Sequence, residues 1–358
     1  MDGRQRRILH CDMDSFFAAV HMRDEPHLAE VPLVIGGDPD GRGVVSTANY
    51  AARAYGIHSA QPAATAQRLC PQAVFLRPDL ERYRRESDRI MAIFGEFTPV
   101  VEPASLDEAY LDISDHLAPY DSATAVAEAI RERVRAETGL TVSIGVSSSR
   151  LVAKIASDWD KPDGLTVVPP KEVVAFLAPL PVRKLHGVGP ATERALAEQG
   201  IESVADLRRW GREELAGVLG QFGATLHDFA QGIDPRPVGL PRERKSLGVE
   251  DTFQSDITAL AEMDRVLEAM AAHVYDRLSQ RGLSGRTVTV KVRYADFRTV
   301  TRSQTLSRPV ADGEELAGWA RRLLRRTDAR DQPVRLLGVT VENLAEAGQT
   351  GEQLGLFG

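Results

Sequence analysis

Short apolar runs alternate with longer amphipathic stretches over the first half of the chain. A short apolar run bounded by turn residues predicts a buried strand, and apolar positions three and four residues apart predict one face of a helix. The predicted strands are residues 7–12, 33–35, 43–46, 73–76, 108–113 and 142–146. The predicted helices are residues 15–22, 80–97 and 123–137. Strands that alternate with helices in this way predict an α/β arrangement around one sheet.

The pattern changes after Pro162, Pro169 and Pro170. Short helical segments rich in Leu and Gly, clearest at 191–199 and 204–210, predict an all-helical unit. Residues 234–244 hold three prolines and little apolar content, which predicts an extended, exposed linker and a domain boundary. Beyond it the pattern predicts helices at 260–278 and 314–326 and strands at 287–294, 299–303 and 334–341. The chain from residue 345 is rich in Gly and Gln, which predicts a mobile tail.

Length and composition describe an ordinary globular chain. At 358 residues the chain is long enough for two to four domains. Its apolar stretches are short and interrupted, and no apolar segment follows the basic residues 1–7, so we expect neither a membrane span nor a secretory signal and place the protein in the cytoplasm. The two cysteines, Cys11 and Cys70, lie in unrelated contexts, which favours buried free thiols over a disulfide.

Charge gives two opposed indications about a nucleic-acid partner. The net charge of −7 argues against one, because DNA-binding proteins usually carry a basic excess. Between Arg281 and Arg308, however, seven basic residues face only one acidic residue, Asp296. Strand alternation places Lys291 and Arg293 on one face of that segment, which predicts a basic sheet surface that follows a DNA backbone. A solvated face with no partner is the alternative.

Carboxylates stand where predicted strands begin and end. Asp12 directly ends an apolar strand, and Asp107 and Glu108 open another. Three hard oxygen ligands at neighbouring strand ends are what a pair of Mg²⁺ ions needs for displacement at phosphorus, with Mn²⁺ as a possible substitute. The alternative is that these carboxylates only cap neighbouring helices, which is common near turns.

Two segments that contain these carboxylates resemble a known family. Residues 10–18, His-Cys-Asp-Met-Asp-Ser-Phe-Phe-Ala, and residues 105–112 resemble the two metal motifs of the Y family of translesion DNA polymerases, of the bacterial DNA polymerase IV type. The resemblance implies that Asp12 and Asp107 bridge two Mg²⁺ ions, that Glu108 binds the ion that activates the primer hydroxyl, and that the Met13 backbone carbonyl is also a ligand. It implies a structural role for Asp14, in holding the turn.

The resemblance covers the whole chain and implies a multidomain right-hand polymerase. We expect an α+β palm with a ferredoxin-like sheet, fingers, an all-helical thumb and an α+β little finger. The expected boundaries are 1–14 and 80–169 for the palm, 15–79 for the fingers, 170–236 for the thumb, 237–245 for a linker, 246–343 for the little finger and 344–358 for a tail.

The same resemblance implies a nucleotide-binding site. Phe17, on the helix that leaves the metal site, would be the steric gate that excludes the ribonucleotide 2′-hydroxyl. Tyr50, Arg53 and Lys161 would bind the triphosphate. Small residues would form the roof over the nascent base pair and tolerate damaged bases: Gly37, Val44, Ser46 and Ala60. Ser149 and Arg150 depart from the Asn and Lys that are usual in the family, which puts a local hydrogen bond and a phosphate contact in doubt.

Contacts with DNA and with a protein partner are implied as well. Gly187 and Gly189, ahead of a predicted helix, resemble a helix-hairpin-helix turn, whose backbone N–H groups meet a phosphate. The expected DNA-binding residues of the little finger are Arg286, Lys291, Arg293, Arg298 and Arg302. The tail resembles the motif by which bacterial polymerases dock on the sliding clamp, through Gln353, Leu354, Leu356 and Phe357.

These expectations converge on a function. We expect template-directed, low-fidelity translesion DNA synthesis in DNA repair and damage tolerance, from dNTPs on primer-template DNA, by a monomer without a proofreading exonuclease. Two alternatives stay open. A catalytically inactive, clamp-bound DNA-binding protein should have lost a metal carboxylate, and all three are present. A palm-type nucleotidyl cyclase would not need the hairpin turn or the basic sheet.

Overall fold

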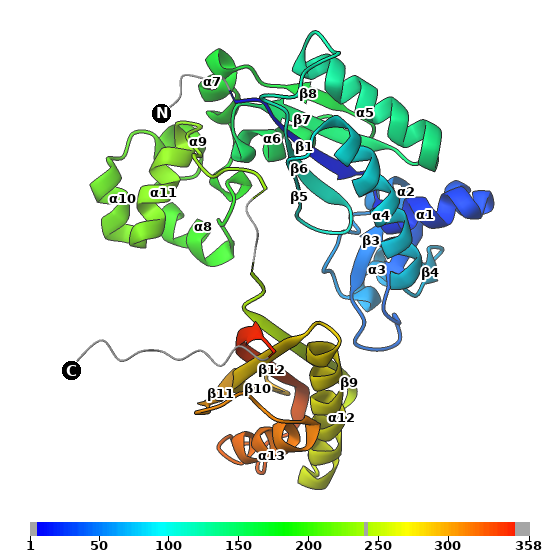
Figure 1. The fold of residues 1–358 in the computed structure, drawn as a ribbon, viewed down its shortest axis with the longest axis vertical. Helices are drawn as coiled ribbons and strands as arrows, with labels where there is room; N and C mark the ends of the chain where they lie inside the picture. Colours follow the sequence, from blue (N-terminus) through cyan, green and yellow to red (C-terminus); the bar gives the residue numbers. More distant parts are fainter. Residues whose placement is uncertain (1–5, 240–242, 348–358) are drawn as a thin grey trace. The chain divides into compact units, whose positions relative to one another are not determined.

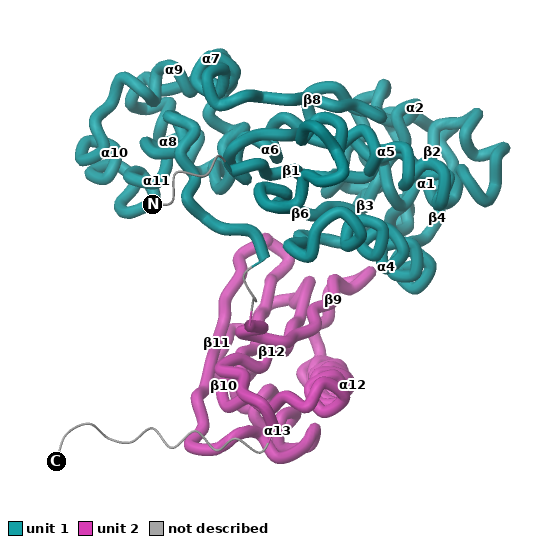
Figure 2. Tube along the Cα trace, turned by 45° about the horizontal axis from the view of Figure 1, so that its top comes forward, with its two compact units in different colours: residues 1–240 teal, residues 241–358 magenta. Residues whose placement is uncertain are grey.

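The computed structural model describes residues 6–239 and 243–347, and the chain divides into two compact units, residues 1–240 and 241–358 (Figures 1 and 2). Each unit has its own hydrophobic core. The first unit holds a five-stranded sheet, a three-stranded sheet and a group of short helices, whereas the second holds one four-stranded sheet and two long helices. Within the described ranges no helix has the length and apolar character that a membrane crossing requires.

The five-stranded sheet carries the predicted metal motifs. Its order is β5 (Val101–Pro103), β6 (Glu108–Asp112), β1 (Ile8–Met13), β7 (Val142–Ser147) and β8 (Leu165–Val167). All neighbours are antiparallel except β7 and β8, which are parallel. The predicted strands at 7–12, 108–113 and 142–146 are therefore present within a residue or two of their expected ends.

The two faces of this sheet differ because side chains alternate along each strand. Leu9, Cys11 and Met13 of β1 pack into the main core with α4 (Leu80–Phe97) and α5 (Ala123–Thr138). The opposite face of β1 lies against α6 (Arg150–Ser157). Gly145 of β7 makes this approach possible, since a Cβ atom there would collide with the Ala153 carbonyl oxygen on α6. The helix backbone therefore rests directly on the sheet.

A smaller sheet packs beside the first helix. It has the order β3 (Val45–Ala48), β2 (Leu33–Gly36) and β4 (Val74–Leu76). The strand predicted at 43–46 begins later, at Val45, because Val44 forms an isolated bridge with Pro62 instead of joining the ladder. The accompanying helical segments are α1 (Phe16–Asp24), the 3₁₀ segment η1 (Pro26–Glu30), α2 (Tyr50–Arg53) and α3 (Ala63–Leu69).

The predicted helical unit follows the large sheet. Its elements are η2 (Pro170–Glu172), α7 (Val173–Leu177), η3 (Val182–Lys184), α8 (Pro190–Ala197), α9 (Val204–Leu207), α10 (Arg212–Leu219) and α11 (Gln221–Ala230). The helix predicted at 204–210 ends at Leu207. Helices α10 and α11 were not predicted, since Gly217, Gly220 and Gly223 interrupt their pattern.

The first part of the linker predicted at 234–244 is extended and mostly exposed, but two of its residues are buried and it is held to the large sheet. Asp234 and Val238 are only 3% and 7% exposed. Arg150 on α6 donates a hydrogen bond of 2.7 Å to the Pro237 carbonyl oxygen, and the Gly239 N–H donates one of 3.1 Å to Glu102 on β5. The prolines and charges of this segment suggested full exposure. Its backbone groups instead bond to the buried ion pair of Arg150 and Glu102, which holds the segment against the large sheet.

The second unit has a fully antiparallel sheet with the order β11 (Thr299–Thr305), β10 (Leu283–Tyr294), β12 (Val334–Glu346) and β9 (Ser246–Ile257). Helices α12 (Leu260–Ser279) and α13 (Gly313–Leu324) cover the face on which Val288, Val290 and Val292 are fully buried. The predicted alternation of β10 is thus confirmed. Strand β9 was not predicted because most of its residues are polar and no apolar alternation runs through it.

Candidate active site

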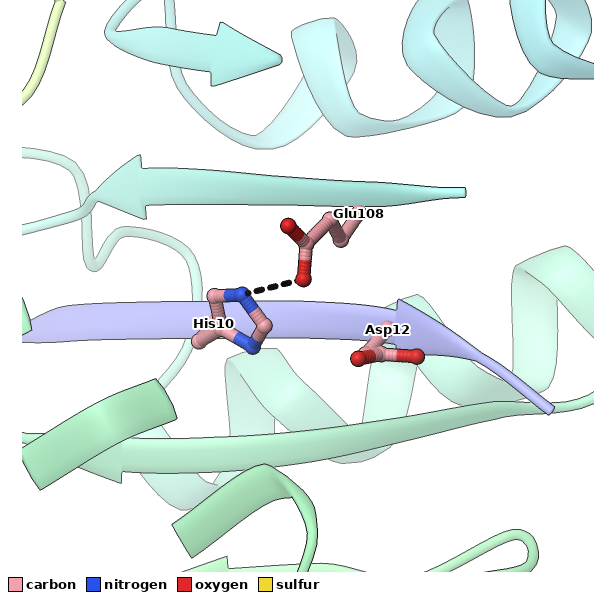
Figure 3. Close-up of side chains that lie close together, drawn as sticks. All are labelled: His10, Asp12 and Glu108. Carbon is pink, nitrogen blue, oxygen red and sulfur yellow. Dashed lines mark ion pairs between the residues drawn. The ribbon is translucent and has the colours of Figure 1, made fainter. Parts of the chain in front are cut away.

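Three titratable side chains meet on the α6 side of the large sheet. Asp12 on β1 and Glu108 on β6 are direct cross-strand partners, and His10 lies two residues before Asp12 on the same face (Figure 3). Each of the three offers a potential ligand atom, and these atoms lie within 4.8 Å of one another. Strand pairing therefore brings two of the predicted metal carboxylates together.

The Asp107 carboxylate lies outside this group. Asp107 precedes β6, and its carbonyl oxygen accepts a hydrogen bond of 2.9 Å from the Met13 N–H. Its side chain accepts a hydrogen bond of 2.5 Å from the Ser105 hydroxyl. The structure thus places Asp107 and Met13 beside the site through their backbones.

Two lysines neutralise the carboxylates. Lys161 donates to Asp12 across 2.5 Å and lies 3.4 Å from Asp158, while Lys154 on α6 forms an ion pair with Glu108. Lys161 was expected as a triphosphate ligand, and in this structure its ammonium group rests on a predicted metal ligand. Neither Lys154 nor His10 was predicted as a site residue, although His10 is the first residue of the motif at 10–18.

The two carboxyl groups have opposite pKa shifts. Burial raises the pKa of Asp12 to about 6, an effect that Lys161 opposes and Asp107 reinforces. A hydrogen bond from His10, helped by Lys154, lowers the pKa of Glu108 to about 2. Burial lowers the pKa of His10 itself. Asp12 is thus the carboxylate whose ionised form depends most on a nearby cation.

The donor set suits a hard divalent cation. The carboxylates of Asp12 and Glu108 supply the oxygen ligands that Mg²⁺ prefers. The nitrogens of His10 are already engaged, since Nδ1 lies 2.7 Å from the Ser157 hydroxyl and Nε2 lies 3.3 Å from Glu108. His10 is therefore held between Ser157 and Glu108, and the two carboxylates are the oxygen donors that could hold an ion.

Asp14 has the structural role expected of it. The residue is only 3% exposed. Its carboxylate accepts hydrogen bonds from the Thr141 hydroxyl at 2.8 Å, the Ser143 hydroxyl at 2.8 Å and the Asp163 N–H at 2.7 Å. Because these donors come from the start of β7 and from the loop that holds Lys161, Asp14 ties that loop to the metal-motif strand.

Phe17 lies on α1 with a partly buried ring. The ring stacks on Tyr83 of α4, with centroids 4.0 Å apart and ring planes 9° apart. Tyr83 was not predicted as a site residue. It falls on the apolar stripe of α4 with Ile90 and Phe94, so its sequence position looks like that of any core aromatic.

The other predicted nucleotide contacts gather near β2 and β3. The Arg53 guanidinium lies 4.9 Å from the Tyr50 ring centroid and donates to the Ala48 carbonyl oxygen at 2.9 Å. The Tyr50 hydroxyl lies 3.3 Å from Asp14, and burial together with Asp14 raises the pKa of Tyr50. The predicted roof residues share this region, at the β2–β3 hairpin and its bridge partner segment: Gly37, Val44, Ser46 and Ala60.

Ser149 and Arg150, which depart from the family pattern, have clear structural roles. The Ser149 hydroxyl caps α6 by accepting from the Val152 N–H. Arg150 forms a buried, bidentate ion pair with Glu102 at 2.6 and 2.8 Å. Arg150 is therefore not available to a phosphate in this structure.

The predicted DNA-binding residues lie in both units. Gly187 has a left-handed φ of 90°, and Gly189 is the N-cap of α8, so the backbone turns sharply before that helix. On the second unit, Lys291 pairs with Glu250 at 2.7 Å and Arg298 with Asp328 at 2.8 Å. Arg293 and Arg302 donate to Thr299 and to the Arg326 carbonyl oxygen. The predicted clamp-binding residues Gln353, Leu354, Leu356 and Phe357 lie outside the described residues.

Sequence profiles of known families match most of the chain. The impB/mucB/samB family profile matches residues 11–158, and the profile of that family's C-terminal domain matches residues 244–356. A third profile, described as the DNA polymerase-iota thumb domain, matches residues 183–234. The three matches follow one another in the order of the large sheet, the helical group and the second unit.

Full-length relatives and a solved structure agree with these profiles. The chain is 52% identical to DNA polymerase IV of Alkalilimnicola ehrlichii, with 99% of each chain covered. It is 51% identical to DNA polymerase IV of Halorhodospira halophila, with 95% of each covered. A Y-family DNA polymerase chimera of Dbh and Dpo4 superposes with a TM-score of 0.87 at 27% identity, covering 95% of this chain and 99% of the chimera.

Proposed function

The chain belongs to the impB/mucB/samB family of Y-family DNA polymerases, and from that premise we propose that it is a DNA-directed DNA polymerase that synthesises across damaged templates. The observation that carries the proposal is the cross-strand pair of Asp12 and Glu108, with Asp107 joined to Met13 by a backbone hydrogen bond. We assign the reaction to nucleotidyl transfer from a dNTP to the primer 3′-hydroxyl, with release of pyrophosphate.

Asp12, Asp107, Glu108 and the Met13 carbonyl would hold two Mg²⁺ ions. Once bound, such ions would lower the pKa of the primer hydroxyl and neutralise the triphosphate. The Asp107 side chain, which accepts a hydrogen bond from Ser105, would have to turn toward the other two carboxylates to join them. His10 and Lys154 keep Glu108 ionised and oriented.

Tyr50, Arg53 and Lys161 would bind the triphosphate. Lys161 donates a hydrogen bond to Asp12, so its ammonium group lies beside a proposed metal ligand, where triphosphate oxygens would be within its reach. Arginine can grip phosphate oxygens with two parallel hydrogen bonds. Phe17 would exclude ribonucleotides, and the small roof residues would accept damaged bases.

We assign the large sheet to the palm, the small sheet to the fingers, the helical group to the thumb and the second unit to the little finger. The turn at Gly187 and Gly189 and the basic strands β10 and β11 would contact primer-template DNA. The alternatives are less favoured. A nucleotidyl cyclase needs neither a thumb nor a basic sheet, and an inactive DNA-binding protein need not keep all three carboxylates.

Primer extension tests the proposed activity. Wild-type protein with Mg²⁺, dNTPs and a primer-template duplex should extend the primer according to the template. The Asp107→Ala, Glu108→Ala double variant should lose extension and keep duplex binding, because it lacks two metal ligands. The variant Glu128→Ala, which removes an exposed carboxylate of α5, is the control and should extend normally. A wild type that binds the duplex and extends nothing would leave the inactive DNA-binding protein as the better account.

The terminal residues Gln353, Leu354, Leu356 and Phe357 would tether the enzyme to the bacterial sliding clamp. A tether raises the effective concentration of the enzyme at the primer end without any new contact at the active site. A chain that ends at Glu352 should therefore extend short primers as well as the wild type does, and lose its stimulation by clamp. If the clamp stimulated primer extension by the truncated chain as much as by the wild type, the proposed tether would be wrong.

A further inference from the structure

The rings of Phe17 and Tyr83 form a nearly parallel stack that joins α1 to α4. Stacking adds only a modest energy beyond the apolar area that the rings bury, so the stack by itself fixes the two rings weakly. In this stack the fixed ring is Tyr83, which is fully buried. The position of the Phe17 ring therefore depends on what holds Tyr83.

His21 holds Tyr83 by its hydroxyl group. The two residues are joined by a buried contact of 2.9 Å between His21 Nε2 and the Tyr83 oxygen. His21 lies one helical turn after Phe17 on α1, so both side chains reach the same part of α4. One helix thus contacts the two ends of the Tyr83 side chain, with Phe17 on the ring face and His21 on the hydroxyl.

The neighbour of His21 determines which nitrogen carries the proton. Arg82 Nη1 lies 3.1 Å from His21 Nδ1, and a guanidinium can only donate hydrogen bonds. Nδ1 must therefore be the acceptor, which leaves the proton of the neutral ring on Nε2, where it is donated to Tyr83. Arg82 is itself held by Asp24 of α1, to which its Nε donates at 3.1 Å.

We propose that His21 is a positioning residue that fixes Tyr83, and through it the Phe17 ring, and so determines how strictly ribonucleotides are excluded. The inference rests on the proposed role of Phe17 as steric gate. His21 does not touch the nucleotide in this account. By fixing Tyr83, His21 limits how far the Phe17 ring can move away from a clash with the 2′-hydroxyl of a ribonucleotide.

The charges around His21 predict a pH dependence. Arg82 lies on one side, and Glu25 lies 3.8 Å from Nδ1, with Asp79 at the start of α4 farther away. Burial, followed by Arg82, lowers the pKa of His21, and Glu25 opposes them. The ring is therefore neutral at neutral pH. A proton on Nδ1 would face the Arg82 donor and disrupt the arrangement in acid.

The test compares incorporation of a dNTP and its matching rNTP by the full-length chain. His21→Leu should lower the ratio of the two kcat/KM values by about 2- to 10-fold, since it removes one hydrogen bond worth roughly 0.5–1.5 kcal/mol. His21→Gln should restore most of the ratio, because its amide can donate to Tyr83. In the wild type the ratio should stay constant through the ordinary histidine range near about 6.5 and fall only at lower pH, because the pKa of His21 is lowered. In His21→Leu the ratio should not respond to pH. His27→Leu, in η1, is the matched control and should leave the ratio unchanged.

Further variants separate this inference from the proposed function. Phe17→Ala should admit ribonucleotides freely, and if it does not, the steric gate itself is wrong. If Phe17→Ala admits them while His21→Leu matches the wild type at every pH, only the role of His21 is wrong. Tyr83→Phe removes the same hydrogen bond from the other side, so it should reproduce the His21→Leu ratio, and the double variant should add nothing. Additive effects in the double variant would also overturn the inference. If His21→Leu fails to fold, the Tyr83→Phe variant alone decides, and a wild-type ratio in that variant would overturn the inference.

Discussion

Asp12 is a largely buried carboxyl group that must be ionised to bind a metal ion. Its side chain is 18% exposed, and in the described structure it forms an ion pair of 2.5 Å with Lys161. Burial destabilises the ionised carboxylate of Asp12 by more than Lys161 stabilises it, and the pKa therefore rises to about 6. At neutral pH without metal, ionised Asp12 therefore lowers the stability of the folded chain.

Asp12→Asn should accordingly stabilise the metal-free protein while abolishing synthesis. At pH 7.5 in chelator we expect its free energy of unfolding to rise by about 2 kcal/mol. The folded pKa of about 6 lies above the ordinary value of 3.8, so the wild type recovers this stability as the pH falls from 6 to 3.8 and the advantage of the variant disappears. Urea unfolding at several pH values measures it, with the exposed Asp121→Asn as control. An Asn variant less stable than the wild type at pH 7.5 would contradict the burial argument.

Individual residues were predictable where sequence position determines geometry. Asp12 and Glu108 follow from strand ends, because cross-strand pairing then brings them face to face. Tyr83 and His21 could not be found in this way, since an apolar stripe does not reveal which aromatic in it supports a functional ring. The pairing of Lys161 with Asp12 depends on a loop conformation that no local pattern specifies.

At the scale of elements, the Arg150–Glu102 pair joins three segments. It links α6 to β5, and both partners also bond to the backbone of residues 237–239. A buried ion pair adds little over an apolar pair, but removing one partner leaves a charge without compensation. The pair therefore makes the position of the segment that follows the thumb sensitive to single substitutions.

Arg150→Met should destabilise the first unit by about 3 kcal/mol, because Glu102 would remain buried and unpaired. The double variant Arg150→Met, Glu102→Leu should recover much of the loss. Calorimetry of both variants measures the difference. Arg133 and Glu137 form an exposed pair at 2.6 Å on α5, so Arg133→Met is a fitting control and should cost less than about 1 kcal/mol. If Arg150→Met and Arg133→Met lowered the free energy of unfolding equally, burial of the Arg150–Glu102 pair would not determine its contribution to stability.

Elements with strong periodicity were predicted, and those without it were not. Helix α4 has the predicted bounds because Tyr83, Ile90 and Phe94 repeat at helical spacing and Asp79 caps the first turn. Strand β9 lacks a buried face over most of its length and is held by its pairing with β12. Such a strand depends on its partner, which lies far away in sequence.

At the scale of the whole molecule, the two units have separate cores. The second core is built from α12, α13 and the buried face of its sheet, within residues 247–344. The second unit also contains the local excess of basic residues between Arg281 and Arg308, and DNA responds to local charge more than to net charge. Domain separation was predictable from composition, whereas the docking of residues 234–239 was not.

A fragment of residues 243–347 should fold alone and bind duplex DNA. Its circular dichroism should show a cooperative thermal transition, because its core needs no residue of the first unit. Binding should weaken steeply as salt rises. The triple variant Arg286→Ala, Arg293→Ala, Arg302→Ala should lose most of this affinity, while Arg308→Ala, whose side chain pairs with Glu315, should keep it. A fragment that folds and shows no salt-dependent binding would assign DNA contact to the first unit alone.

The direct contact of α6 with the sheet at Gly145 has a consequence for how this protein can evolve. Where side chains separate a helix from a sheet, a gain or loss of one methylene changes their spacing, and drift in the core slowly moves whatever the helix carries. At Gly145 the spacing is determined by backbone against backbone. Neutral substitutions elsewhere in the core should therefore leave the distance between Lys154 on α6 and Glu108 on the sheet unchanged. The same contact makes position 145 nearly intolerant of mutation.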